Sequence, residues 1–138
     1  MAQTLKEFRQ EILDLSDEER INVARRQVQI LGQPVSGSDL RNLMRLVARV
    51  FVSADKNCDG YEYELYVKAT GDRCTSQEFY DFTNGGSNPA VIQDLVDFCQ
   101  KIADEYRYAI AIFGCCLMAH DGTLTVAEQQ IFERVLGY

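Results

Sequence analysis

Two aspartate–glutamate pairs with the same spacing are the residues in this sequence best suited to chemistry. Asp55 and Glu62 are seven residues apart, and so are Asp121 and Glu128. A constant offset of 66 residues relates each member of the first pair to its counterpart in the second. Carboxylate oxygens are the hard ligands that Ca²⁺, Mg²⁺ and Mn²⁺ prefer. We therefore predict a divalent-cation site if folding brings the four carboxylates together.

The residues around each pair repeat as well. Each copy reads as an apolar helix with an aspartate at its end, followed by a polar loop. After the loop come a cap residue, a glutamate in the first turn of the next helix and then an apolar pair. Such repetition predicts two helix–loop–helix units packed about an approximate twofold axis. If the units pair, their carboxylates repel one another unless they are protonated or bridged by a cation.

Helix capping is the alternative explanation for the two glutamates. Asp59 and Thr125 are ordinary N-cap residues, and Glu62 and Glu128 follow them by three residues, as in a capping box. Caps explain both glutamates without a metal, but they do not explain why an aspartate precedes each loop at the same offset. Metal binding and capping both remain open from the sequence.

Neither copy is an EF-hand. The segment Asp55–Gly60 matches the first six positions of that calcium loop, but Tyr66 stands where the twelfth position needs a bidentate glutamate. In the second copy Leu117 and Ala119 fall where the first and third positions need oxygen ligands.

The second copy resembles the TerB-like family, named for tellurite-resistance protein B. The resemblance is carried by Leu117–Glu128 with Ile131 and Phe132 after it, and by the looser copy from Ser53 to Glu62. It covers about residues 38–138. It implies a compact all-helical bundle of two related halves and a non-enzymatic role in bacterial stress or tellurite resistance. Carried over by position, the metal site that the resemblance implies consists of Asp55, Glu62, Asp121 and Glu128.

The first copy departs from this pattern. Lys56 stands where the second copy has Gly122, and Asp59-Gly60 comes four residues late. If Asp59 were the equivalent of Asp121, its partner seven residues on would be Tyr66, and the first half of the metal site would be lost.

Apolar residues recur at helical spacing along most of the chain, and no segment combines strict alternation with turn signals. We therefore predict an all-α bundle of about seven helices, with capping signals at Ser16–Glu19, Thr75–Glu78 and Asn88-Pro89. The apolar period from 92 to 117 predicts either one long helix or two helices broken near 106–108. A loop at 33–38 divides an N-terminal helical arm, residues 1–37, from the main body, residues 38–138. We expect the two to form one compact unit.

Charge limits the partners. The net charge of −7 argues against nucleic acid, which needs clustered basic residues. Residues 50–138 hold fourteen acidic and six basic side chains, so the acidic bias lies where the motifs lie. Arg41, Arg45 and Arg49 form a stripe that we interpret as a solvated helix face. The alternative is a docking strip for an acidic protein or a membrane surface. Other proteins are the predicted partners.

Cysteines and apolar runs indicate the compartment. Five cysteines with no CxxC spacing, and an N-terminus without an apolar signal segment, predict a cytoplasmic protein with reduced thiols. The longest apolar run, Ala109–Ala119, is too short to span a bilayer.

An enzymatic site has one candidate pair. Cys116 lies four residues before His120, the only histidine, so the two share a helix face and suit a nucleophile with its base or two ligands of a soft metal. A cysteine in such an apolar run is more often packed in the core. We therefore predict that the protein is not an enzyme.

Overall fold

The structure, a computed structural model, describes residues 5–54, 60–83, 88–118 and 126–136. Eight α-helices and no β-strand occur in these ranges, which confirms the all-α prediction with one helix more than the expected seven. In chain order the helices are α1 (Leu5–Leu13), α2 (Asp17–Leu31), α3 (Gly37–Ala54), α4 (Gly60–Thr70), α5 (Ser76–Thr83), α6 (Pro89–Gln100), α7 (Asp104–Leu117) and α8 (Val126–Leu136).

Two of the predicted capping boxes define helix starts. The Ser16 hydroxyl accepts the backbone N–H of Glu19 at 3.2 Å, and the Glu19 carboxylate accepts the Ser16 N–H at 3.1 Å. Thr75 and Glu78 make the same reciprocal pair at 3.2 and 3.0 Å before α5. Each box satisfies two N–H groups that a helix start leaves without intrahelical partners, so α2 and α5 begin at these residues.

The long apolar segment forms two helices, and the break lies earlier than the predicted 106–108. Helix α6 begins after Asn88, whose side chain accepts the Ala90 N–H at 2.9 Å. It ends at Gln100, with Lys101 as the C-cap, and the backbone of Ala103 is extended (φ −67°, ψ 156°) before α7. The acidic Asp104 in the first turn of α7 favours a helix start there, because it complements the positive end of the helix dipole.

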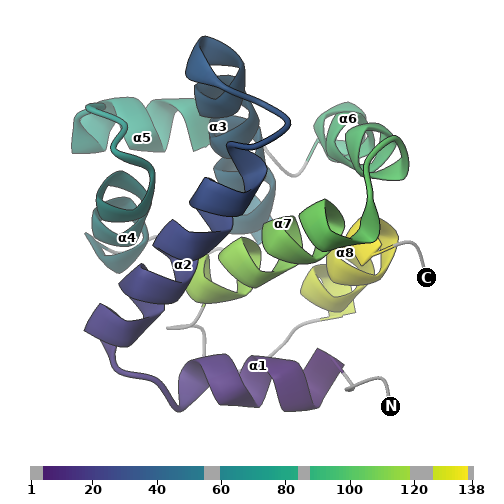
Figure 1. The fold of residues 1–138 in the computed structure, drawn as a ribbon, viewed down its shortest axis with the longest axis horizontal. Coiled ribbons are helices and arrows are strands. Elements are labelled where there is room, and N and C mark those ends of the chain that lie inside the picture. Colours follow the sequence, from purple (N-terminus) through teal and green to yellow (C-terminus); the bar gives the residue numbers. More distant parts are fainter. Residues whose placement is uncertain (1–4, 55–59, 84–87, 119–125, 137–138) are drawn as a thin grey trace.

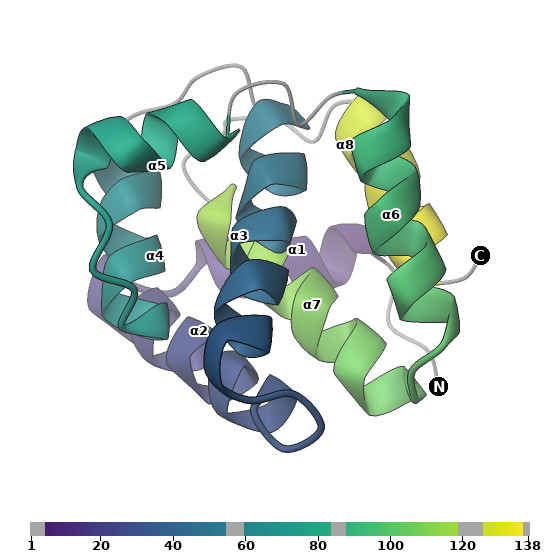
Figure 2. The same ribbon diagram turned by 90° about the horizontal axis from the view of Figure 1, so that it is seen from above.

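Helix α3 lies in the middle of the bundle. Figure 2 shows α4 and α5 on one side of it and α6 and α8 on the other, and α3 contacts all four. Helix α7 crosses α3, and α2 packs along α7 and α4 (Figure 1). Ala24, Val28 and Leu31 of α2 belong to the same buried cluster as the residues of α3 and α7. The N-terminal segment therefore shares the core of the main body.

The predicted helix–loop–helix repeat is present in the fold. Helices α4 and α8 each have 11 residues, and the offset of 66 residues that relates the motifs also relates their bounds. Positions related by this offset are buried in both copies: Met44 and Ile110, Val47 and Phe113, Val50 and Cys116, Phe51 and Leu117, Leu65 and Ile131, Tyr66 and Phe132. Helix α3 contacts α7, α4 contacts α7, and α8 contacts α3, as an approximate twofold axis between the copies requires.

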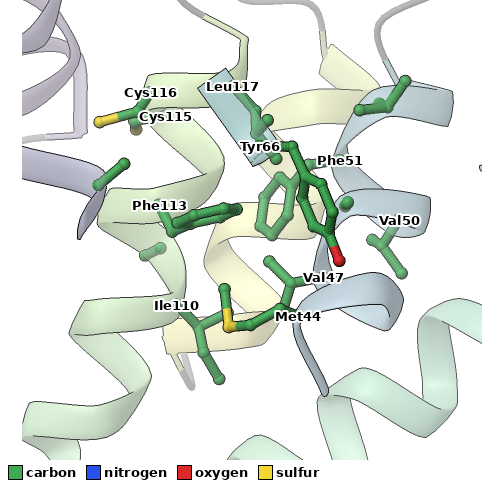
Figure 3. Close-up of a cluster of buried hydrophobic side chains, with 14 of the residues drawn as sticks. Met44, Val47, Val50, Phe51, Tyr66, Ile110, Phe113, Cys115, Cys116 and Leu117 are labelled. Carbon is green, nitrogen blue, oxygen red and sulfur yellow. The ribbon is translucent and has the colours of Figure 1, made fainter. Parts of the chain in front are cut away.

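The first helices of the two copies approach closely at Gly114. A methyl group on Gly114 would lie 2.8 Å from three ring carbons of Phe51. The Phe51 ring also packs against the Phe132 ring, with centroids 4.9 Å apart. Figure 3 shows Phe51 among the buried side chains of both copies. The absence of a side chain at position 114 therefore lets α7 accept the aromatic ring of α3.

None of the eight described helices combines the length and the apolar character that crossing a bilayer requires.

Candidate metal centre

The structure describes the surroundings of one of the four predicted carboxylates. Glu62 lies in the first turn of α4, and its residue is 1% exposed. Asp55 and Asp121 lie outside the described residues. Glu128 lies in the first turn of α8, at the position equivalent to Glu62, but its side chain is outside the described part.

The burial of Glu62 sets it apart from the capping glutamates of this chain. Glu19 and Glu78 complete capping boxes at α2 and α5, and both are exposed to solvent. Glu62 holds the corresponding first-turn position in α4, yet it is among the largest fully buried side chains. A capping box needs no burial, and burying a carboxylate is costly unless hydrogen bonds or a cation compensate it. Burial therefore distinguishes Glu62 from the two exposed capping glutamates, and its charge has a partner within the protein.

The start of α4 is joined to the end of α7, the helix that leads to Asp121. The Tyr61 hydroxyl donates a hydrogen bond of 2.6 Å to the backbone carbonyl oxygen of Cys116. Tyr61 directly precedes Glu62, and Cys116 lies five residues before Asp121. The start of α4, which holds Glu62, therefore contacts the last turn of α7, and Asp121 follows α7 in the chain outside the described residues.

Arg20 brings a positive charge to the same region from α2. Its residue is 7% exposed, and its guanidinium lies 5.5 Å from the centroid of the Tyr61 ring. It forms an ion pair of 2.8 Å with Asp17, one turn away. Nothing in the sequence pattern singled out Arg20, because its neighbour in the fold is 41 positions further along the chain.

Within the described ranges, no group of three or more histidine, cysteine, aspartate or glutamate side chains is placed to hold a metal ion. Of the four predicted ligands, only the side chain of Glu62 falls within these ranges. The predicted cation site therefore keeps one structurally described member, the buried Glu62 of α4.

The environment of Cys116 does not suit a nucleophile at neutral pH. Cys116 is fully buried, and burial raises the pKa of its thiol to about 12. The thiolate is the reactive form of cysteine, and a thiol with such a pKa is almost wholly protonated at neutral pH. His120, its proposed partner, lies outside the described residues.

Cys116 should accordingly react slowly with iodoacetamide in the folded protein at pH 7.5. Peptide mapping by mass spectrometry after timed alkylation measures this rate, and the same reaction in concentrated urea gives the rate for the exposed thiol. Burial and the raised pKa predict that the folded protein reacts at least about a hundredfold more slowly. Comparable rates in both conditions would contradict the buried position and revive the nucleophile hypothesis.

The arginine stripe of α3 is fully exposed only at its first member. Arg41 is exposed, whereas Arg45 and Arg49 are half-buried. Arg45 forms a bidentate ion pair with Asp72, with Nε–Oδ2 and Nη2–Oδ1 distances of 2.8 and 3.0 Å. The Nε of Arg49 is buried without a hydrogen-bond partner in the described part of the chain. The interpretation of the whole stripe as a solvated face is therefore wrong, because the connection after α4 folds against it.

Asp72 lies at the centre of the polar cluster around Arg45. Besides the two Arg45 bonds, its oxygens accept the Tyr66 hydroxyl at 2.8 Å and the Cys74 N–H at 3.2 Å. Its side chain is 4% exposed. The hydrogen bonds from Arg45 hold the pKa of Asp72 below its ordinary value of 3.8. No sequence signal pairs these two residues, since Arg45 and Asp72 are 27 residues apart and Asp72 belongs to no motif.

No family model matches the sequence, and no curated protein or solved structure matches it significantly.

Proposed function

We propose that this chain is a non-enzymatic, TerB-like domain that binds a divalent cation through carboxylates of both copies of its repeat. The burial of Glu62 is the observation that carries the proposal. The capping glutamates Glu19 and Glu78 are exposed to solvent, whereas Glu62, at the same helix position, is 1% exposed. Glu62 already has a partner within the protein, and a bound Ca²⁺, Mg²⁺ or Mn²⁺ would add a further ligand for its buried oxygens.

The repeat supports the other three ligands. Glu128 shares the helix position of Glu62, and the hydrogen bond between Tyr61 and Cys116 joins the start of α4 to the end of α7. Asp55 and Asp121 follow α3 and α7, the two first helices of the copies, which contact each other. With Glu62, these residues form the proposed set of ligands. The resemblance to TerB-like proteins extends the proposal to a role in bacterial stress or tellurite resistance through contacts with other proteins.

Cations should therefore raise the thermal stability of the protein after treatment with a chelator. At a concentration one hundred times its dissociation constant, a ligand that binds only the folded state adds about 2.7 kcal/mol to the free energy of unfolding. For a chain of this length, that corresponds to a rise in melting temperature of roughly 5–10 °C. Differential scanning fluorimetry with Ca²⁺, Mg²⁺ and Mn²⁺ in turn measures the rise.

Glu62→Gln should abolish the cation-dependent rise, and Glu64→Gln is its matched control. Glu64 lies two residues further along the same helix, is exposed and pairs with Lys68 at 2.6 Å. Both variants lose one negative charge, so a general charge effect would act on both alike. If Glu62→Gln does not fold, Asp121→Asn takes its place.

Indifference of the wild-type protein to all three cations would contradict the proposal. The remaining interpretation would then be a structural interaction module in which the carboxylates act as helix caps. In that case both glutamine variants would change stability modestly and neither would alter any response to cations.

A further inference from the structure

A positively charged pocket lies where α3 meets the connection between α4 and α5. It has a volume of about 400 Å³, and three arginines line it: Arg41, Arg45 and Arg73. Its acidic lining residues are Asp72 and Glu78. The connection follows the last turn of α4, whereas Glu62 lies in the first turn, so the pocket is separate from the candidate metal centre. Figure 2 shows α4 and α5 beside α3 on this side of the bundle.

Arg45 is fixed in the wall of this pocket. Its bidentate ion pair with Asp72 neutralises one charge of each sign, and its guanidinium lies 5.0 Å from the centroid of the Phe82 ring. A guanidinium held on both sides loses little conformational freedom when another ligand approaches. Arg45 therefore contributes a fixed side chain to the pocket wall, and its charge is already neutralised by Asp72.

Arg41 and Arg73 supply the excess positive charge. Both are exposed, and neither forms an ion pair or a side-chain hydrogen bond with a residue of the described ranges. The remaining acidic group, Glu78, already accepts the Thr75 N–H at 3.0 Å. Two free guanidiniums against one carboxylate leave the pocket positive within a chain whose net charge is −7.

We propose that this pocket binds a phosphate dianion, free or as a monoester on a small molecule. Guanidinium groups bind phosphate oxygens in a bidentate manner, and the two free ones match the two negative charges of the dianion. The pocket volume also leaves space for a substituent on the phosphate. Local positive charge in a generally acidic protein would draw the anion to this one face.

Titration with inorganic phosphate and with O-phosphoserine at constant ionic strength tests the proposal. Backbone amide NMR shifts of Arg41, Arg73 and their neighbours should change saturably with both ligands. The double variant Arg41→Gln with Arg73→Gln should raise the dissociation constant at least about tenfold, because it removes two charge-assisted contacts. The control, Arg26→Gln with Lys101→Gln, removes the same charge at two exposed residues outside the pocket and should leave the constant unchanged.

Two further measurements depend on the charge of this pocket in particular. Glu78→Gln should tighten phosphate binding, because it removes the one unneutralised negative charge in the lining; glutamine still completes the capping box. Binding should also weaken from pH 7.5 to pH 5.5, since phosphate monoesters lose their second charge near a pKa of about 6.

Four results would overturn the proposal. Equal weakening in the control variant would show that the binding follows net charge alone. Equal affinity for acetate would assign the pocket to carboxylates of an acidic protein segment. Binding to phosphatidic acid vesicles without binding to either soluble phosphate would assign it to a membrane surface. No saturable shift with any of these probes would remove the site.

Discussion

Gly114→Val should lower the free energy of unfolding by about 3 kcal/mol or more. The first added carbon would lie 2.8 Å from three ring carbons of Phe51, closer than carbon atoms approach in folded proteins. The ring has little room to retreat, because Phe51 is fully buried and packs against Phe132. Overpacking of a dense core typically costs about 1–3 kcal/mol and sometimes more. Urea denaturation followed by circular dichroism measures the loss from the midpoint at constant slope.

Gly60→Val is the matched control for this substitution. Gly60 is exposed at the start of α4, and a methyl group there would meet nothing within 4 Å. Its valine variant should therefore change stability by no more than about 0.5 kcal/mol. A double-mutant cycle of Gly114→Ala with Phe51→Leu should show coupling of at least about 0.5 kcal/mol, because a smaller side chain at 51 makes room for the methyl group. Strict additivity would contradict the close contact.

Asp72→Asn should cost about 2–3 kcal/mol at neutral pH. The carboxylate accepts two hydrogen bonds from Arg45, one from the Tyr66 hydroxyl and one from the Cys74 N–H, with a side chain that is 4% exposed. An amide can keep only part of this set, and hydrogen bonds to charged groups contribute about 1.5–3 kcal/mol each. The expected loss stays below the sum of the bonds, because the Arg45 side chain is 35% exposed and solvent takes up part of its charge.

The same substitution should flatten the dependence of stability on acid pH. Because Arg45 lowers the pKa of Asp72 in the folded state, the unfolded chain takes up a proton at higher pH than the folded protein does. The stabilisation is therefore fully present above the ordinary value of 3.8 and is lost as the pH falls through the lower, folded pKa. Urea midpoints from pH 6 down to pH 2.5 should fall more steeply in the wild-type protein than in Asp72→Asn.

Tyr66→Phe separates the hydrogen bond from the ion pair. It removes one donor to Asp72 and leaves both bonds from Arg45, so it should cost about 1 kcal/mol and retain most of the acid dependence. If Asp72→Asn and wild type showed the same pH profile, the lowered pKa of Asp72 would not contribute to folding.

The sequence predicted the parts of this fold that depend on local interactions. The reciprocal pair Ser16 and Glu19 caps α2 as expected, because both partners lie within one helical turn and need nothing from the rest of the chain. The duplicated helix–loop–helix was visible for a different reason. Two units that pack in the same way keep apolar residues at positions related by the same offset, as Tyr66 and Phe132 are.

Contacts between segments that are distant in the chain could not be predicted from the sequence. Apolar residues keep their helical period through Ile102, so the pattern gave no reason to place the break between α6 and α7 at 101–103. The stripe containing Arg45 looked solvated, because its partner Asp72 lies beyond a whole further helix. Periodicity shows which face of a helix is apolar but not what covers the polar face.

The sequence predicted the candidate metal site only through the spacing of its residues. The sequence marked Glu62 through its offset from Glu128, but the same spacing fits a helix cap equally well. What distinguishes Glu62 from the capping Glu19 is burial, and burial arises from α4 packing against α7 and α2. The contact of Tyr61 with Cys116 joins residues 55 apart, and no local pattern encodes it.

The close contact of Phe51 with Gly114 also makes the two units of the repeat unequal. By the repeat offset, Ala48 is the counterpart of Gly114 and Leu117 is the counterpart of Phe51. The first copy therefore carries the aromatic ring, and the second copy carries the glycine without a side chain that accepts it. An ancestral homodimer of a single unit would have had identical residues on both sides. The two units of this chain differ in complementary ways, and two copies of residues 37–70 would set a phenylalanine against an alanine twice. The first unit therefore does not fit against a second copy of itself without repacking around Phe51.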